Sequence, residues 1–345
     1  MNIILDLFRG AVIGIANIIP GVSGGTMALV LGIYQRILRD IELINQNTII
    51  AFLKIFTFKK QNLKNAGDEF KRIDGFFIIK IVAGALGIIV LLAGIKISSI
   101  NDKTVMTYLL TDHHDATYGF FFGLVALSFI SPLRLIKKIN LSAALSALAA
   151  VILILTVSFS MSDENLIKRA QVKQKIETVK DGSQKTSVSF GDRAIHYGYL
   201  FFLGAIAISA MILPGVSGSF LLLLMGGYFM VMDVLSNRMF IDIGFFAAGC
   251  LIGLVLFSRF LNFLLNRWHD QTMAFLVGLV LGSLWMIWPF KKTVLIGKET
   301  VYLSNIFPSN FGTNEIVTGI TIISGMVIVG IMIWLEIKYA KTESS

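Results

Sequence analysis

The sequence predicts an all-α integral membrane protein made of two inverted repeats, each with one broken or re-entrant helical hairpin and three transmembrane helices. Of its 345 residues, 55% are hydrophobic and 15% are charged, and the mean hydropathy is +0.78. One soluble core cannot cover that much apolar surface. Eight apolar segments follow one another, most of them near the ~20 residues that a helix needs to cross hydrocarbon. The string Pro20-Gly21-Val22-Ser23-Gly24 also occurs a second time, letter for letter, at residues 214–218.

The repeats are predicted at residues 1–161 and 197–338, with an extracytoplasmic loop at 162–196 between them. The first and fifth apolar segments are too long for one crossing, and both contain the Pro-Gly string. Because Pro removes a backbone donor and Gly accepts most φ values, each string should break its helix and start a new one at membrane depth. The predicted elements are a broken hairpin at 1–34 and helices at about 76–95, 117–133 and 141–160, then a broken hairpin at 197–232 and helices at about 243–264, 271–288 and 316–335.

Two further matches between the halves support a duplication. His114-Asp115 begins a block that His269-Asp270 begins again, and both blocks continue with matching Thr, Phe, Gly-Leu-Val and Ser positions. The pairs Phe76-Phe77 and Phe245-Phe246 open two further apolar runs. The matched elements occur in the same order in both halves.

Three single crossings per half would give the two halves opposite orientations, because an odd number of crossings places the second half in the membrane upside down relative to the first. Cytoplasmic loops accumulate Lys and Arg close to the membrane. Such bases follow the first hairpin, follow Pro132 and end the chain at Lys338 and Lys341, although the loop from Met161 to Tyr197 also carries several. We therefore expect both termini on the cytoplasmic side. Because the start lacks a basic n-region and an A-x-A cleavage site, Met1 to Ile19 is expected to be mature structure.

Groups that could carry catalysis are scarce. None of the four histidines is followed by a second metal ligand three or four residues later, so no metal site is predicted. The His114-Asp115 and His269-Asp270 pairs could relay protons, but both lie at predicted helix starts, where Asp is a common cap beside the positive dipole end. We favour capping and predict no catalytic residue and no cofactor.

The net charge of +9 fits the positive-inside bias and contact with anionic membrane phospholipids, and no arrangement of bases and aromatics indicates nucleic acid. Residues 41–58 are apolar with scattered polar positions and end in Lys59-Lys60. This pattern suits a helix on the membrane surface near anionic lipid and, almost equally, a soluble surface helix.

The repeated string can bind an anion. The first turn of the new helix exposes backbone N–H groups that have no internal acceptor, at an end made partly positive by the peptide dipoles. Phosphate suits such a site, since small residues leave room for its oxygens and hydroxyls add donors. The candidate residues are Gly21, Ser23, Gly24, Gly25 and Thr26 in the first copy and Gly215, Ser217, Gly218 and Ser219 in the second. The same residues equally suit close helix packing, so the pattern alone leaves the two interpretations even.

Few charges could neutralise such an anion inside the membrane. Arg9 lies about three helical turns before Pro20, or ~16 Å at 1.5 Å per residue, so it faces either the cavity or the membrane surface. Asn17 is a candidate polar lining residue. Three more bases lie within or at the ends of crossing helices, where ionisable residues are functional candidates: Lys80, Lys96 and Arg259.

The segments 14–26 and 210–220, which contain the two strings, closely resemble the polyprenyl-phosphate transporters of bacteria. Gly32-Ile33-Tyr34 and Phe122-Gly123-Leu124-Val125 fit the same family, and the resemblance covers nearly the whole chain. It implies a flippase-like transporter, not an enzyme, in the bacterial cytoplasmic membrane. Its cargo would be undecaprenyl phosphate, returned across that membrane for another round of cell-envelope synthesis.

Such a cargo suits the predicted architecture, because its tail can stay in lipid while its anionic head needs shelter from hydrocarbon. Two broken helices from inverted halves would meet near the midplane and open in turn to either side, which is alternating access.

Two other function classes stay open at this point. Membrane phosphatases for polyprenyl pyrophosphate also carry Pro-Gly-Ser motifs on broken helices. In proteins with such chemistry, an Arg lies beside the serine motif and an acidic cluster lies on a neighbouring helix. Neither feature occurs next to Ser23 or Ser217. A small-anion channel or carrier would use the same helix ends, and a lateral opening for a lipid tail would distinguish it from a lipid transporter.

Overall fold

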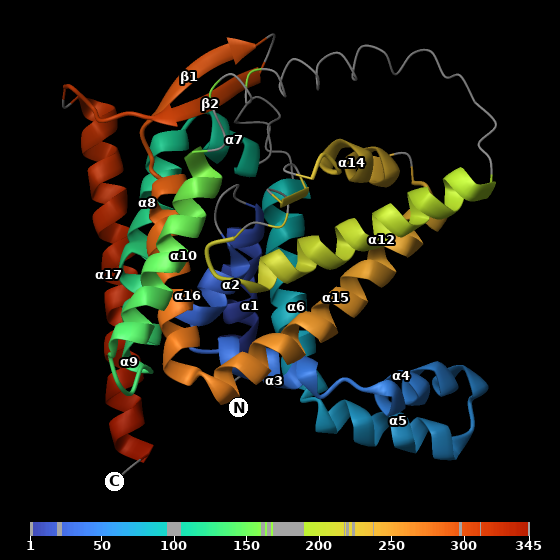
Figure 1. Cartoon of the computed structure of the whole chain (residues 1–345). Helices are drawn as coiled ribbons and strands as arrows, with labels where there is room; N and C mark the ends of the chain where they lie inside the picture. Colours follow the sequence, from blue (N-terminus) through green and yellow to red (C-terminus); the bar gives the residue numbers. More distant parts are fainter. Residues whose placement is uncertain are drawn as a thin grey trace.

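The computed structural model describes residues 3–18, 23–94, 105–159, 163, 167, 190–216, 218, 221–222, 225–236, 238–296, 299–310 and 312–343. This part of the chain is mostly helical (Figure 1). Six of the described helices are long and apolar enough to cross a membrane. Their spans are Gly75–Leu92, His114–Arg134, Leu141–Phe159, Ala194–Ile212, Phe240–Arg267 and Thr313–Ile331. The prediction of a helical, multi-pass membrane protein is therefore confirmed.

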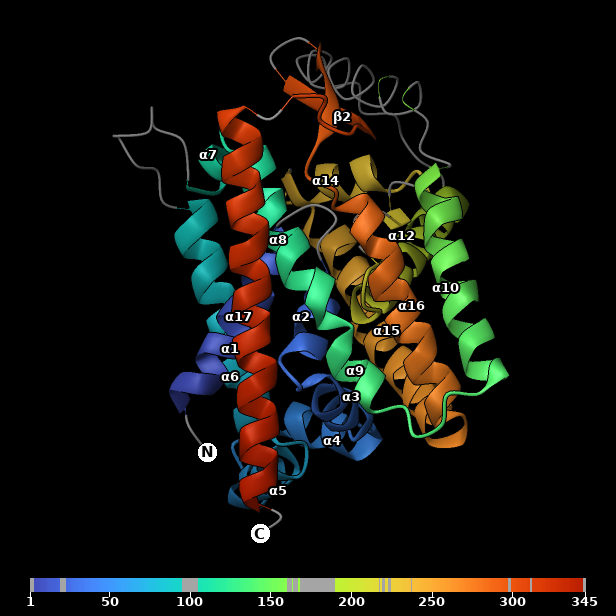
Figure 2. The same ribbon diagram turned by 90° about the vertical axis from the view of Figure 1, so that its left-hand side faces the viewer.

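Four helices form a row in the order α17, α8, α16 and α10, seen face-on in Figure 2. Their bounds are His114–Ser128 for α8, Leu141–Phe159 for α10, His269–Met286 for α16 and Thr313–Glu343 for α17. The row mixes the halves of the chain, because α8 of the first half packs along α17 of the second, and α16 of the second packs along α10 of the first.

The helix predicted at 271–288 forms as α16 but is not one of the six apolar spans. Its first turn holds His269, Asp270 and Gln271, which lower its mean hydropathy. Its apolar side chains face protein instead of lipid, and Leu276 and Leu279 are fully buried. A helix in the centre of the row can therefore carry polar residues that a lipid-facing helix could not.

Matched residues make matched contacts along the row. A Cβ added to Gly123 of α8 would lie 2.0 Å from a backbone oxygen of α17, and one added to Gly278 of α16 would lie 2.2 Å from a backbone oxygen of α10. Ser128 and Ser283 are buried, and each donates to the carbonyl oxygen three residues earlier at 2.7 Å. Small residues thus allow the close backbone approach typical of membrane helices.

A second pairing also recurs in the two halves. α1 (Ile3–Ile18) packs along α6 (Gly75–Ile89), and α12 (Phe190–Ile212) packs along α15 (Phe240–Arg267). A Cβ on Gly10 would lie 2.1 Å from a backbone oxygen of α6, and one on Gly204 would lie 2.2 Å from a backbone oxygen of α15. These two glycines keep the same offset in sequence as the two prolines of the repeated string.

The segment predicted as the first hairpin contains α1 and α2 (Gly24–Val30) and leads into α3 (Tyr34–Glu42), and the segment predicted as the second runs from α12 towards α14 (Tyr228–Ser236). We keep the names first and second hairpin for these two segments. α3 lies near the end of the molecule that holds both termini, and α14 lies near the opposite end (Figures 1 and 2). Gly32 and Gly226 precede α3 and α14 with φ of +67° and +73°. Glycine adopts this left-handed conformation without a Cβ clash, which explains its presence at both turns.

Shorter elements lie around this framework. Near the termini, α4 (Gln46–Leu53), a 3₁₀ turn (Lys54–Thr57) and α5 (Lys60–Arg72) project sideways (Figure 1). At the opposite end, β1 (Lys291–Ile296) and β2 (Glu299–Asn305) form an antiparallel hairpin. The remaining elements are a π-helical turn at Val90–Gly94, α7 at Val105–Thr111 and α9 at Ile130–Arg134.

The β hairpin is an addition to the all-α fold that the sequence predicts. Its strands are six and seven residues long, too short to stand out in a hydropathy pattern that is dominated by membrane helices. Its β-branched Thr and Val residues suit extended backbone. Of the predicted loop at 162–196, the structure describes residues 163, 167 and 190–196, and α12 already begins at Phe190, so the loop ends earlier than predicted.

Candidate functional site

The two repeated strings meet at the contact between the hairpins. Ser23 is the buried N-cap of α2, and its Oγ donates to the carbonyl oxygen of Leu213 at 3.2 Å. Thr26, in the first turn of α2, accepts on its Oγ1 from the backbone N–H of Gly215 at 2.8 Å. Both hydroxyls predicted as phosphate donors around the first string therefore contact the other half of the chain, at Leu213 just before the second string and at Gly215 within it. We call this contact the hairpin junction.

Glycines let backbones come close across the hairpin junction and, within the second half of the chain, beside it. A Cβ on Gly25 would lie 2.6 Å from the oxygen of Ile212, and one on Gly218 would lie 2.5 Å from the oxygen of Ala207. Gly215 has φ of +78°, and its Cβ would lie 2.5 Å from the oxygen of Leu279 in α16. At these three positions the absence of a side chain permits the packing itself, as the packing interpretation of the motif requires.

Asn17 has a definite partner at the same place. Its Oδ1 accepts from the backbone N–H of Gly24 at 3.2 Å, so it satisfies one of the N–H groups left open at the start of α2. Ser23 makes no side-chain cap of its own, because its hydroxyl reaches the second hairpin. Three further candidates lie outside the described residues: Gly21, Ser217 and Ser219.

Comparison with known proteins places the chain in a family. The family model described as VCA0040-like, undecaprenyl phosphate translocase-like, matches residues 13–304, which include both strings. The chain belongs to that family. A polyprenyl-phosphate transporter of Vibrio cholerae serotype O1 is 34% identical over 294 residues, which are 85% of this chain and 80% of the relative. A polyprenyl-phosphate transporter of Staphylococcus aureus is 28% identical over 305 residues, which are 85% of this chain and 88% of the relative. No solved structure matches.

The resemblance seen in segments 14–26 and 210–220 is thus confirmed.

The range matched to the family also contains three of the four basic residues that the sequence proposes as candidates, and the fourth, Arg9, lies just before that range. Its Nη1 is 3.3 Å from the carboxylate of Asp6, which also pairs with the Nζ of Lys80 from α6. Asp6 is 1% exposed, so two bases share one buried acid between α1 and α6. Asp6 was not among the residues predicted from the sequence, although its place three residues before Arg9 on a helix could have indicated the pair.

Of the other two basic candidates, the structure describes Arg259 but not Lys96. Arg259 of α15 donates to the backbone oxygen of Ile44 at 2.8 Å, and Asn262, one turn later, donates to Glu42. Both contacts tie α15 to the segment that follows the first hairpin. Arg259 therefore has a structural partner, while Lys96 lies outside the described residues.

The paired His-Asp motifs do not cap their helices as favoured from the sequence. The N-cap residues are His113 and Trp268, and neither helix start has a side-chain cap. Each Asp lies two positions after the N-cap, in the first turn, where its charge still suits the helix dipole. Each also bonds the preceding histidine, at 2.9 Å for Asp115 and 3.2 Å for Asp270. Asp270 also accepts from the backbone N–H groups of residues 137 and 138 at 2.9 and 3.1 Å, so it fixes the loop before α10.

A separate cavity of about 320 Å³ lies beside the β hairpin, between the starts of α8 and α17. Asp115, Lys291 and Glu315 are its charged lining residues. Burial lowers the pKa of Lys291 to about 8. None of the predicted phosphate-binding residues lines this cavity, and no group of three or more acidic, His or Cys side chains in the described ranges could hold a metal ion.

Proposed function

We propose that this chain transports polyprenyl phosphate, as undecaprenyl phosphate, across the bacterial cytoplasmic membrane so that the carrier lipid is used again in cell-envelope synthesis. The observation that carries the proposal is the 34% identity, over 85% of the chain, to a protein named polyprenyl-phosphate transporter. The apolar helices support it, because such a cargo must be handled within the bilayer.

The fold supports an inverted repeat with two re-entrant hairpins. α1 pairs with α6 as α12 pairs with α15, and α8 pairs with α17 as α16 pairs with α10. α3 and α14 lie near opposite ends of the molecule (Figure 1), as expected when the two hairpins enter from opposite sides and turn back. Paired, oppositely oriented broken helices are typical of secondary transporters, whose substrate sites lie where the halves meet.

We place the phosphate head at the hairpin junction. Three donors lie there: the hydroxyls of Ser23 and Thr26 and the N–H of Gly215. Ser23 donates to the Leu213 oxygen and the Gly215 N–H donates to Thr26, so both bonds join the two hairpins. A state that binds phosphate would exchange these bonds for bonds to phosphate oxygens, with small shifts of α2 against the end of α12. Ser217, which matches Ser23 in the repeat, and Ser219 would contribute from the second copy.

This exchange gives a physical basis for alternating access. The row α17, α8, α16 and α10 interlocks the halves, while the pairs α1–α6 and α12–α15 flank the junction. We propose that the row is the fixed scaffold and that each flanking pair moves in turn to open the junction to its own side. The buried Asp6 with Arg9 and Lys80 would hold α1 and α6 together during that movement.

A transport function without hydrolysis fits the surroundings of Ser23. The described partner of its hydroxyl is a backbone oxygen, whereas a phosphatase needs a cationic group and a proton donor at the phosphate. Purified protein is expected to release no inorganic phosphate from polyprenyl pyrophosphate with magnesium or calcium present.

The direct test is reconstitution in phosphatidylcholine vesicles that contain a fluorescent polyprenyl phosphate. A membrane-impermeant quencher should remove only the outer-leaflet signal in protein-free vesicles. When the protein is present, it should also remove the inner-leaflet signal, because the protein carries inner-leaflet lipid to the outer leaflet. The Gly25→Leu variant is the control, because its side chain would collide with the Ile212 oxygen at the junction. Equal loss of signal with and without protein would contradict the proposed function.

A further inference from the structure

An apolar stripe runs along one side of α4 and the 3₁₀ turn that follows it. Its side chains recur at helical spacing and are largely exposed. They are Ile49, Ile50, Leu53 and Phe56, with exposed fractions of 53%, 46%, 64% and 77%. Phe58, at the tip of the segment, is 80% exposed. We call these five residues the α4 surface.

The opposite side of α4 packs on α5, so the direction of the stripe is fixed. Thr48 is buried and bonds the carboxylate of Glu69 at 2.7 Å. Arg72 reaches the Thr48 hydroxyl at 2.7 Å and the backbone oxygen of Leu43 at 2.8 Å. At the start of α4, Asn45 and Thr48 form a reciprocal capping box. The α4 surface therefore cannot rotate inward against α5 without breaking this network.

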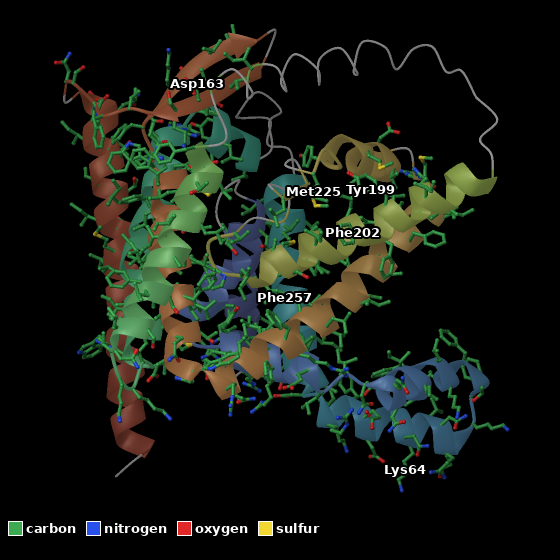
Figure 3. All side chains as sticks on the ribbon, viewed as in Figure 1. Lys64, Asp163, Tyr199, Phe202, Met225 and Phe257 are labelled. Carbon is green, nitrogen blue, oxygen red and sulfur yellow. The ribbon has the colours of Figure 1, made fainter. Side chains whose placement is uncertain are left out.

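The helix pair projects sideways from the bundle near the end that holds both termini (Figure 1). In that view α4 lies nearer than α5 to the level of the membrane helices. In Figure 3, Lys64 of α5 points away from α4 and from the bundle. A pair placed this way extends over the lipid beside the bundle, with α4 towards the hydrocarbon and α5 towards water.

The charges near the stripe are basic. Residues 46–72 contain six Lys or Arg and two Asp or Glu, a formal excess of four positive charges. Glu69 pairs with Arg72 at 2.6 Å, which leaves the excess on lysines. Lys54 follows Ile50 by one helical turn, and Lys59 and Lys60 follow Phe58 directly. Aromatic and aliphatic side chains flanked by lysines suit the boundary between acyl chains and anionic headgroups.

We propose that the α4 surface is a binding site for anionic phospholipid in the leaflet on the side of the two termini. Its apolar side chains would enter the acyl boundary, and Lys54, Lys59 and Lys60 would contact headgroup phosphates. This contact holds the helix pair against the bilayer. It involves different residues from the hairpin junction and does not depend on which lipid the protein transports.

The test uses the full chain in a Cys250→Ser background, with an environment-sensitive fluorophore on Phe56→Cys or, as the control on the water side, on Lys64→Cys. The protein is placed in nanodiscs of phosphatidylcholine brominated near the headgroup, with or without phosphatidylglycerol. Quenching is expected at position 56 and not at position 64, and it should increase when phosphatidylglycerol is present. Equal quenching at both positions, or none at position 56, would overturn the proposal.

Charge variants distinguish the binding of anionic headgroups from the insertion of apolar side chains into any lipid. Replacing Lys54, Lys59 and Lys60 with Gln should abolish the increase caused by phosphatidylglycerol, whereas the matched change of Lys64 and Lys71 to Gln should leave most of it. High salt should reduce it in the parent protein. If neither the Gln substitutions at Lys54, Lys59 and Lys60 nor high salt changes the quenching at position 56, the surface is only apolar and the proposal of an anionic-lipid site is wrong. If cysteines at position 56 cross-link between molecules while lipid quenching is absent, a second copy covers the surface and the proposal fails.

Discussion

At the scale of single residues, the hairpin junction depends on hydroxyls and amides that serve a structural role in the described conformation. Thr26 is 1% exposed, and its Oγ1 accepts the N–H of Gly215 while its own hydrogen stays available to donate. Ser23 uses its hydrogen on the Leu213 oxygen. Of the two hydroxyls, Thr26 can therefore bond a phosphate oxygen with less rearrangement.

The first prediction concerns Thr26. Thr26→Val keeps the shape but leaves the Gly215 N–H without an acceptor, which should lower the free energy of unfolding by about 1–3 kcal/mol. If the hydroxyl also binds phosphate, affinity for undecaprenyl phosphate should fall by roughly one to two orders of magnitude, since a bond to a charged group contributes about 1.5–3 kcal/mol. Thermal unfolding in detergent and lipid binding to the folded fraction measure the two effects.

Thr26→Ser is the matched control for that experiment, because it keeps both hydroxyl functions and loses one methyl group. It should bind lipid phosphate like the parent. If Thr26→Val also binds like the parent once folded, the hydroxyl has a structural role only, and the phosphate site lies elsewhere.

At the scale of elements, glycines determine which helices can pack backbone to backbone. Gly123 and Gly278 occupy matched positions on α8 and α16, and each lies directly against the backbone of a partner helix. The pattern Phe-x-x-Gly-Leu-Val, found in both halves, marked these helices in the sequence. It could not show that each helix packs against a helix of the other half, because sequence similarity within a repeat carries no information about contacts between repeats.

The second prediction tests this equivalence. Gly123→Ala and Gly278→Ala should each destabilise the fold by about 1–3 kcal/mol, because the added Cβ overlaps a backbone oxygen that cannot move alone. Gly319→Ala and Gly330→Ala on α17 are matched controls, since nothing lies within 4 Å of their Cβ positions. Unfolding in detergent should separate the two pairs. Equal stability for all four variants would contradict the close helix contacts along the row.

At the scale of the whole molecule, the sequence predicts the membrane class, and five of its six predicted single crossings are apolar spans in the structure. It does so because hydropathy reports directly on the apolar length that a helix needs to cross lipid. It does not predict features that depend on contacts within the protein: the burial of α16 in the row, the β hairpin and the buried Asp6. At the candidate site, the sequence pattern proposes Ser23 but cannot predict its partner, because Ser23 and Leu213 are 190 positions apart in the sequence.

The arrangement of the ends gives the last prediction. Both termini and the basic α4–α5 pair lie at one end of the molecule, and the β hairpin lies at the other (Figures 1 and 2). Lys64 and Lys292 are exposed near these two ends. The variants Lys64→Cys and Lys292→Cys, each in a Cys250→Ser background, are labelled with a membrane-impermeant maleimide. If the basic residues lie on the cytoplasmic side, position 64 should react only in inverted vesicles and position 292 only in intact cells. Lys138→Cys, in the loop before α10, should behave like position 64. Labelling of positions 64 and 292 from the same side would exclude a membrane between the two ends and, with it, the inverted repeat. The reverse labelling would keep the fold and place the termini outside.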